Sequence, residues 1–160
     1  MKMKQVCVVV LMSLVARGAL AEEINDSAAK VSFHVPDGWV KDNSGGMLAL
    51  GTSQGDVMIR ITRMPAKDLK AAAKKIEGDL KNTVQKAKKG KTKAVKINGL
   101  PASITEGSGI MGGKPVKLAL IALLTPTDKA FVIVGVVLAE TYAARKAELD
   151  AFVGGIKPLP

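Results

Sequence analysis

The sequence predicts an α+β fold, in which a mainly antiparallel sheet of about six or seven strands has helices packed on its faces. Three observations support this prediction. Short apolar runs bounded by turn residues stand on both sides of one long amphipathic stretch. The turns between consecutive runs are short, which favours antiparallel neighbours. Two later runs are apolar at nearly every position, which is typical of central strands covered on both faces.

The first strands are predicted between residues 31 and 64. A Pro-Asp-Gly turn at residues 36–38 and a second turn at Asn43–Gly46 separate three apolar runs, and Thr52–Gly55 predicts a hairpin. Along the last run, Val57 and its alternate neighbours are apolar, which indicates one buried face. The predicted strands are Val31–Val35, Trp39–Val40, Met47–Leu50 and Val57–Met64.

After Pro65 the apolar period changes from two to three or four residues. From Leu69 through Leu80 and Val84 to Ala87 the apolar positions fall on one helical face, with lysines on the other. This spacing predicts one amphipathic helix of about 20 residues beginning near Ala66. Gly90 is then expected to end the helix as a C-terminal cap.

A second strand group and a final helix complete the chain. The glycine-rich segment Gly107–Gly113 is expected to be a flexible connection between strands. Thr141–Gly154 predicts the last helix, which the prolines of the tail cannot continue. The strands expected here are Thr92–Ile97, Ala102–Glu106, Val116–Leu124 and Ala130–Ala139, and the helix should bury Tyr142, Leu149, Phe152 and Val153 on one side.

Residues 1–21 have the layout of a secretory signal peptide. Two lysines precede an apolar run of about 11 residues, which is too short for the ~20 residues that cross a bilayer, and a small-x-small site ends at Ala21. Cleavage there leaves one domain, residues 22–160, with no transmembrane span and without Cys7, the only thiol. A thiol-free exported chain of this size needs no disulfide, and we expect a bacterial periplasmic or secreted location.

Most of the net positive charge lies in one segment. The whole chain carries a formal net charge of +10, and residues 67–96 hold eleven lysines against three acids. The lysines are densest at Lys86, Lys88, Lys89, Lys91 and Lys93. They form either a solvated helix face and charged edge strand, or a binding face for an anionic surface or an acidic partner. Nucleic acid is not expected, because the segment has no Arg or aromatic residue to read or stack on bases.

The residues offer little catalytic chemistry. His34 is the only histidine, so it has no second imidazole for a metal set, and we expect a structural role. The run from Gly107 to Lys114 is similar to a phosphate loop, but Ser108 stands where a Walker A glycine is needed and Pro115 where Ser or Thr is needed. A Ser-Lys hydrolase using Ser108 and Lys114 is the least favoured alternative. Trp39 is expected to be a packing residue. No cofactor, metal site or catalytic residue is predicted.

Two turns and the chain end resemble a known family. The segment Phe33–Trp39, the Asn-Gly-Leu-Pro-Ala turn at Asn98–Ala102 and the closing Ile156–Pro158 are similar to those of PsbP-like proteins, in particular bacterial periplasmic proteins of the DcrB type. The resemblance covers about residues 31–158 and implies a PsbP-like sandwich. It also implies a non-catalytic accessory, assembly or partner-binding role, since no catalytic motif comes with it.

The sequence therefore predicts an exported, non-enzymatic accessory protein of the bacterial envelope. Its partner is an unknown envelope protein or anionic surface, contacted through the lysine-rich segment. The alternative is a carrier of a small apolar ligand, held in a pocket between the sheet and a helix. An enzyme should bring several titratable groups together, and this sequence offers one His and, after cleavage, no Cys.

Overall fold

The computed structural model describes residues 22–43 and 47–160. The predicted signal peptide at 1–21, with Cys7, lies outside the described residues, as does most of the turn predicted at Asn43–Gly46. In the described part of the chain, no helix has the length and apolar character needed to cross a membrane.

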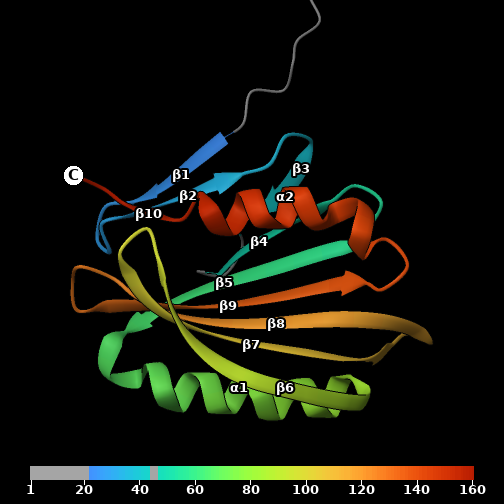
Figure 1. The fold of residues 1–160 in the computed structure, drawn as a ribbon. Helices are drawn as coiled ribbons and strands as arrows, with labels where there is room; N and C mark the ends of the chain where they lie inside the picture. Colours follow the sequence, from blue (N-terminus) through green and yellow to red (C-terminus); the bar gives the residue numbers. More distant parts are fainter. Residues whose placement is uncertain (1–21, 44–46) are drawn as a thin grey trace, which may run out of the picture.

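Two antiparallel sheets and two helices make up the fold (Figure 1). The large sheet contains, in spatial order, β3 (Trp39–Asp42), β4 (Met47–Thr52), β5 (Val57–Pro65), β9 (Lys129–Leu138), β8 (Lys114–Leu124), β7 (Leu100–Met111) and β6 (Gln85–Ile97). The small sheet contains β1 (Glu22–Asp26), β2 (Val31–Val35) and β10 (Lys157–Pro158). The predicted fold class is confirmed, with one correction: Val31–Val35 belongs to a second sheet, which the sequence did not reveal.

The helices lie on opposite faces of the large sheet (Figure 1). A short 3-10 turn, Ala66–Asp68, leads into α1 (Leu69–Thr83), and α2 (Tyr142–Gly154) lies on the other side. We call the two sides the α1 face and the α2 face. Strand β9 is buried along most of its length, as expected for a central strand covered on both faces.

The main core lies between the α2 face, α2 and the small sheet. Ile133 from the large sheet, Phe33 from β2 and Phe152 from α2 are all nearly inaccessible in this core. The side of α2 predicted from the sequence is the packed side: Phe152 is buried, and Tyr142, Leu149 and Val153 pack partly against the same core. The packing role expected of Trp39 is also observed, with its ring stacked on that of Phe152 at 6.4 Å between centroids.

The predicted 20-residue helix was wrong at its C-terminal end. Helix α1 stops at Thr83, because Val84 turns to extended backbone and is buried with Val116 and Val136 in a small cluster on the α1 face. Lys86 then adopts a positive φ of 50°, which breaks the helical path. Residues expected in the last helical turns therefore belong to β6, a strand of 13 residues.

The prediction of a flexible connection at Gly107–Gly113 was also wrong. Strand β7 continues through most of it to Met111, and only Gly112 and Gly113 form the turn to β8. The glycines permit close contact between strands. A Cβ at Gly109 would lie 2.1 Å from Cγ1 of Val84, and a Cβ at Gly90 would lie 2.8 Å from the carbonyl oxygen of Glu106. Gly90 is thus a strand residue beside β7 and not a helix cap.

Candidate functional site

All five lysines of the predicted patch lie on β6, the edge strand of the large sheet. We call Lys86, Lys88, Lys89, Lys91 and Lys93 the lysine strand. Each of them is exposed, and β6 pairs only with β7 among the described strands. The sequence placed this patch partly on a helix. The structure brings the five residues together on one strand, which is bent by irregular pairing at two places.

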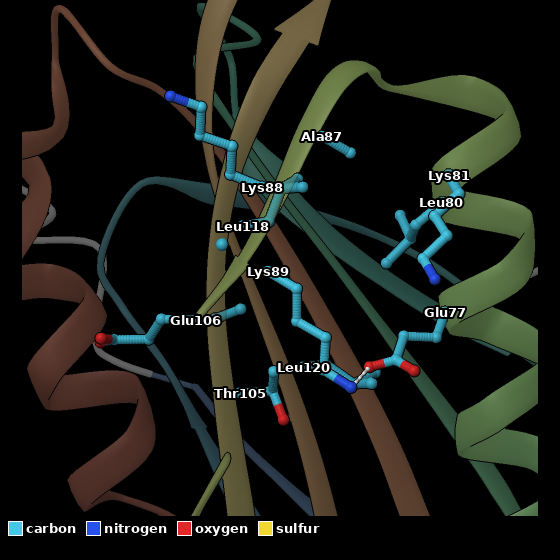
Figure 2. Close-up of a pocket in the computed structure, with 12 residues that line it drawn as sticks. Glu77, Leu80, Lys81, Ala87, Lys88, Lys89, Thr105, Glu106, Leu118 and Leu120 are labelled. Carbon is cyan, nitrogen blue, oxygen red and sulfur yellow. Dashed lines mark ion pairs between the residues drawn. The ribbon is translucent and has the colours of Figure 1, made fainter. Parts of the chain in front are cut away.

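The lysine strand presents its side chains to both faces of the sheet. Lys88 pairs with Ser108 and Lys93 with Ile104, and these two positions of β7 share the α2 face. Lys89 pairs with Gly107 and lies on the α1 face, where its Nζ is 2.5 Å from Oε1 of Glu77. Figure 2 shows Lys89 directed towards α1 and Lys88 directed away from it. The charge therefore surrounds the edge of the sheet.

A small apolar hollow separates the lysine strand from α1 (Figure 2). Leu80 of α1 and Leu118 and Leu120 of β8 supply its apolar lining, and the Lys89 to Glu77 ion pair lies at its side. Its volume is about 70 Å³, well below the ~300–1,000 Å³ of ordinary small-molecule sites. The hollow reflects incomplete packing of α1, which has no fully buried residue, and is too small for a ligand.

A larger cavity of about 510 Å³ lies beneath α2. Strands β5, β7, β8 and β9 form its floor, and α2 forms its wall. This is the position that the sequence assigned to a carrier's pocket. The residues that shape the cavity, Ala119 and Gly135, were missed by sequence reasoning. The available signal was their small size within two otherwise bulky apolar strands.

A polar network fixes α2 against the hairpin formed by β4 and β5. Nε of Arg145 lies 2.8 Å from Oδ2 of Asp56, a carboxylate only 6% exposed, and the Thr52 hydroxyl also donates to Asp56. The hydrogen bond from Arg145 is the main cause that lowers the Asp56 pKa to about 2. Glu148 accepts hydrogen bonds from Arg145 and, at 2.6 Å, from Nε1 of Trp39. The position of the cavity wall therefore depends on these groups.

The structure does not bring together the groups of the hydrolase alternative. Ser108 pairs with Lys117 on β8, whereas Lys114 pairs with Met111 at the turn. The pair that contains Lys114 lies three steps along the β7–β8 ladder from the pair that contains Ser108. At ~3.3 Å per residue, this is a distance of about 10 Å along the strands. His34 lies half-buried in β2 and packs against Gly155. A Cβ added at Gly155 would lie only 2.3 Å from the Cβ of His34, so the two residues are in close contact. The structural role of His34 stays a prediction.

By sequence, the chain matches no protein-family model and no curated protein. By structure, it is similar to cyanobacterial PsbP (CyanoP) from Synechocystis sp. PCC 6803, with a TM-score of 0.62, 14% identity, and coverage of 92% of this chain and 98% of that one. It is similar to LpqN of Mycobacterium tuberculosis, described as involved in cell envelope biogenesis, with a TM-score of 0.58, 17% identity, and coverage of 87% and 90%.

It is also similar to the Ran-binding protein Mog1p of Saccharomyces cerevisiae, with a TM-score of 0.56, 16% identity, and coverage of 85% and 94%. Likenesses at such low identity show the fold alone, since one fold carries many functions. The likeness to DcrB-type proteins stays a prediction. The chain has a PsbP-like α+β fold.

Proposed function

We propose that this protein is an exported, non-enzymatic accessory protein that binds an acidic protein partner through the lysine strand. The observation that carries the proposal is the gathering of Lys86, Lys88, Lys89, Lys91 and Lys93 on one exposed edge strand. Within residues 22–43 and 47–160, Lys89 is the only member of the lysine strand in a salt bridge. The remaining four ammonium groups are available to acids of a partner.

The distribution of the lysines favours a protein over a lipid surface. Lys88 and Lys93 share the α2 face, and Lys89 lies on the α1 face. A flat bilayer that lies against either face of the sheet meets only the lysines of that face. A folded partner with an acidic groove can enclose the edge of the sheet and reach both faces. Partner binding also occurs on this fold, since the similar Mog1p is described as Ran-binding.

The test is cross-linking in the host envelope with wild type and a variant carrying Lys86→Gln, Lys88→Gln, Lys89→Gln and Lys91→Gln. We expect wild type to capture a partner with an acidic surface, and the variant to lose it. Raised salt should weaken capture in the same way, because exposed charges are screened over ~8 Å at physiological ionic strength. The matched control replaces Lys67, Lys70, Lys74 and Lys75 with Gln, which removes equal charge from the segment at α1.

Two results would overturn the proposal. Equal loss of capture in both variants would show that net charge matters and the lysine strand does not. Binding to phosphatidylglycerol vesicles that depends on the lysine strand, with no protein captured, would assign the strand to a membrane surface instead. Arg substitutions at the four positions, which keep the charge, should retain capture.

A further inference from the structure

The cavity under α2 is large enough and apolar enough for a small ligand. Its volume of about 510 Å³ falls within the ~300–1,000 Å³ typical of small-molecule sites. Ile59, Ile121 and Ile133 form much of the floor, and Leu149 and Phe152 extend from α2. These side chains offer dispersion contacts and no hydrogen bonds. The interior therefore suits a hydrocarbon group.

The cavity exists because the floor lacks side-chain volume at its centre. Ala119 of β8 pairs directly with Gly135 of β9, and Gly135 pairs on its other side with Ile59 of β5. A Cβ placed at Gly135 would have no atom within 4 Å, so the space above it is open. Two small residues side by side thus leave a depression, which α2 spans. Larger residues at these positions would fill the depression at little steric cost.

The polar groups lie together at one side of the cavity. Asp150 is paired with Lys146 at 2.6 Å, so these two charges offset each other. Nζ of Lys117 lies 4.9 Å from the centre of the Tyr142 ring, which holds the ammonium group over the aromatic face. Glu106 is the remaining acid of the lining. We call this side the mouth.

Lysines of β6 make the mouth net positive. Glu106 lies on β7 between Ile104 and Ser108, the register partners of Lys93 and Lys88. Lys88, Lys93 and Lys117 are therefore on the α2 face around one glutamate. Lys88, Lys93 and Lys117 outnumber Glu106, which also interacts electrostatically with Lys146, and this excess of positive charge favours a negatively charged group at the mouth.

We propose that this cavity binds a single-chain amphiphile with an anionic head group, such as a free fatty acid. The hydrocarbon chain lies between α2 and the pair formed by Ala119 and Gly135. The head group lies at the mouth beside Lys117. This site goes beyond partner binding by the lysine strand, because its apolar part belongs to α2 and to strands other than β6.

The test is calorimetric titration of the purified protein with lauric, myristic and palmitic acid, each below its micelle concentration. We expect one site per chain, and affinity rising about fourfold for each methylene that enters the cavity. Alcohols and trimethylammonium compounds of the same chain lengths should bind at least tenfold more weakly. Equal affinity for all three head groups would overturn the anionic assignment, and absence of saturable binding would overturn the site.

Variants separate the cavity from the rest of the molecule. Gly135→Ile should lower affinity at least tenfold while leaving the ligand-free protein at least as resistant to urea, because the side chain fills open space. Ala119→Leu provides the same information if Gly135→Ile fails to fold. Ala147→Leu adds an apolar side chain at an exposed position of α2 and should leave affinity unchanged. Wild-type affinity in both cavity variants would refute the proposal.

Two further experiments test the head-group contact and the source of the ligand. Lys117→Gln should reduce binding of the acids and leave binding of the alcohols unchanged. Capture of phosphatidylglycerol vesicles without binding of monomeric fatty acid would show that the ligand is a bilayer lipid, against the proposal. Gly135→Ile leaves β6 unaltered and should retain the cross-linked partner, so failure of this site and failure of the proposed function are distinguishable.

Discussion

Arg145 and Asp56 join α2 to the hairpin of β4 and β5 through a hydrogen bond of 2.8 Å, which Nε of Arg145 donates to Oδ2 of Asp56. The two residues are 89 positions apart in the sequence, and Asp56 is buried. Removing the guanidinium leaves a buried carboxylate without its cation, a change that is strongly destabilising. We therefore expect Arg145→Ala to lower the urea midpoint clearly. Lys146→Ala, which breaks the exposed pair with Asp150 on the same helix, should change it much less. Equal effects would contradict the proposed role of Arg145.

The same pair predicts a loss of stability in acid. Hydrogen bonding from Arg145 lowers the pKa of Asp56 from 3.8 to about 2, so the folded protein binds this proton less readily than the unfolded chain. The stabilisation, about 2 kcal/mol, is complete above pH 4 and is lost as the pH falls towards 2. Urea unfolding of wild type and Asp56→Asn between pH 2 and 7 should show their stability difference shrinking over this window. A constant difference would contradict the assignment.

The sequence predicted most elements from local pattern. Alternation of apolar residues located β5, runs that are apolar at nearly every position located β8 and β9, and apolar spacing correctly selected the buried side of α2, including Phe152. The main error, at Val84, has a physical reason: the apolar spacing fits a helix there, but burial of Val84 with Val116 and Val136 requires extended backbone. Those partners lie more than 30 residues away, so a local pattern does not contain the information.

The residues of the lysine strand could be identified from the sequence, whereas the residues that form the cavity could not. Lysine density identifies the five residues of the patch, but only the register of β6 with β7 shows that they occupy both faces. The cavity depends on the pairing of Ala119 with Gly135, and pairing partners in separate strands are not visible in one sequence. Asp56 and Arg145 were not identified for the same reason.

Two glycines should respond in opposite ways to alanine. Gly78 is exposed in the interior of α1, and a Cβ there meets no atom within 4 Å. We expect Gly78→Ala to raise the free energy of unfolding by about 0.5–1 kcal/mol, because alanine loses less backbone entropy. Gly109→Ala places a Cβ 2.1 Å from Cγ1 of Val84 and should destabilise by about 1–3 kcal/mol. Urea unfolding of both variants measures the change in the free energy of unfolding. A change of the same sign in both variants would contradict the close approach of Val84 to β7.

Ser32 has a buried hydroxyl that forms no hydrogen bond with the described residues. Burying a polar group without a hydrogen-bond partner costs about 1–3 kcal/mol of desolvation free energy. An alanine methyl group at the same place has no polar atom and therefore carries no such desolvation cost. Ser32→Ala should therefore keep or raise the free energy of unfolding. Ser27→Ala, at an exposed position before β2, is the control and should have no effect. A clear loss of stability in Ser32→Ala would show that the hydroxyl has a partner in solution.

The lysine strand should also protect the sheet edge against self-association. Strand β6 is long and exposed and pairs only with β7 among the described strands, so its outer backbone groups could pair with a second copy. Replacing Lys86, Lys88, Lys91 and Lys93 with Thr removes charge repulsion and raises strand propensity. Sedimentation velocity should then show concentration-dependent species heavier than wild type. Gln substitutions at Lys70, Lys74, Lys75 and Lys81 of α1 remove equal charge and should leave the mass distribution unchanged. If both variants associate equally, net charge and not the edge position of the lysines keeps the copies apart.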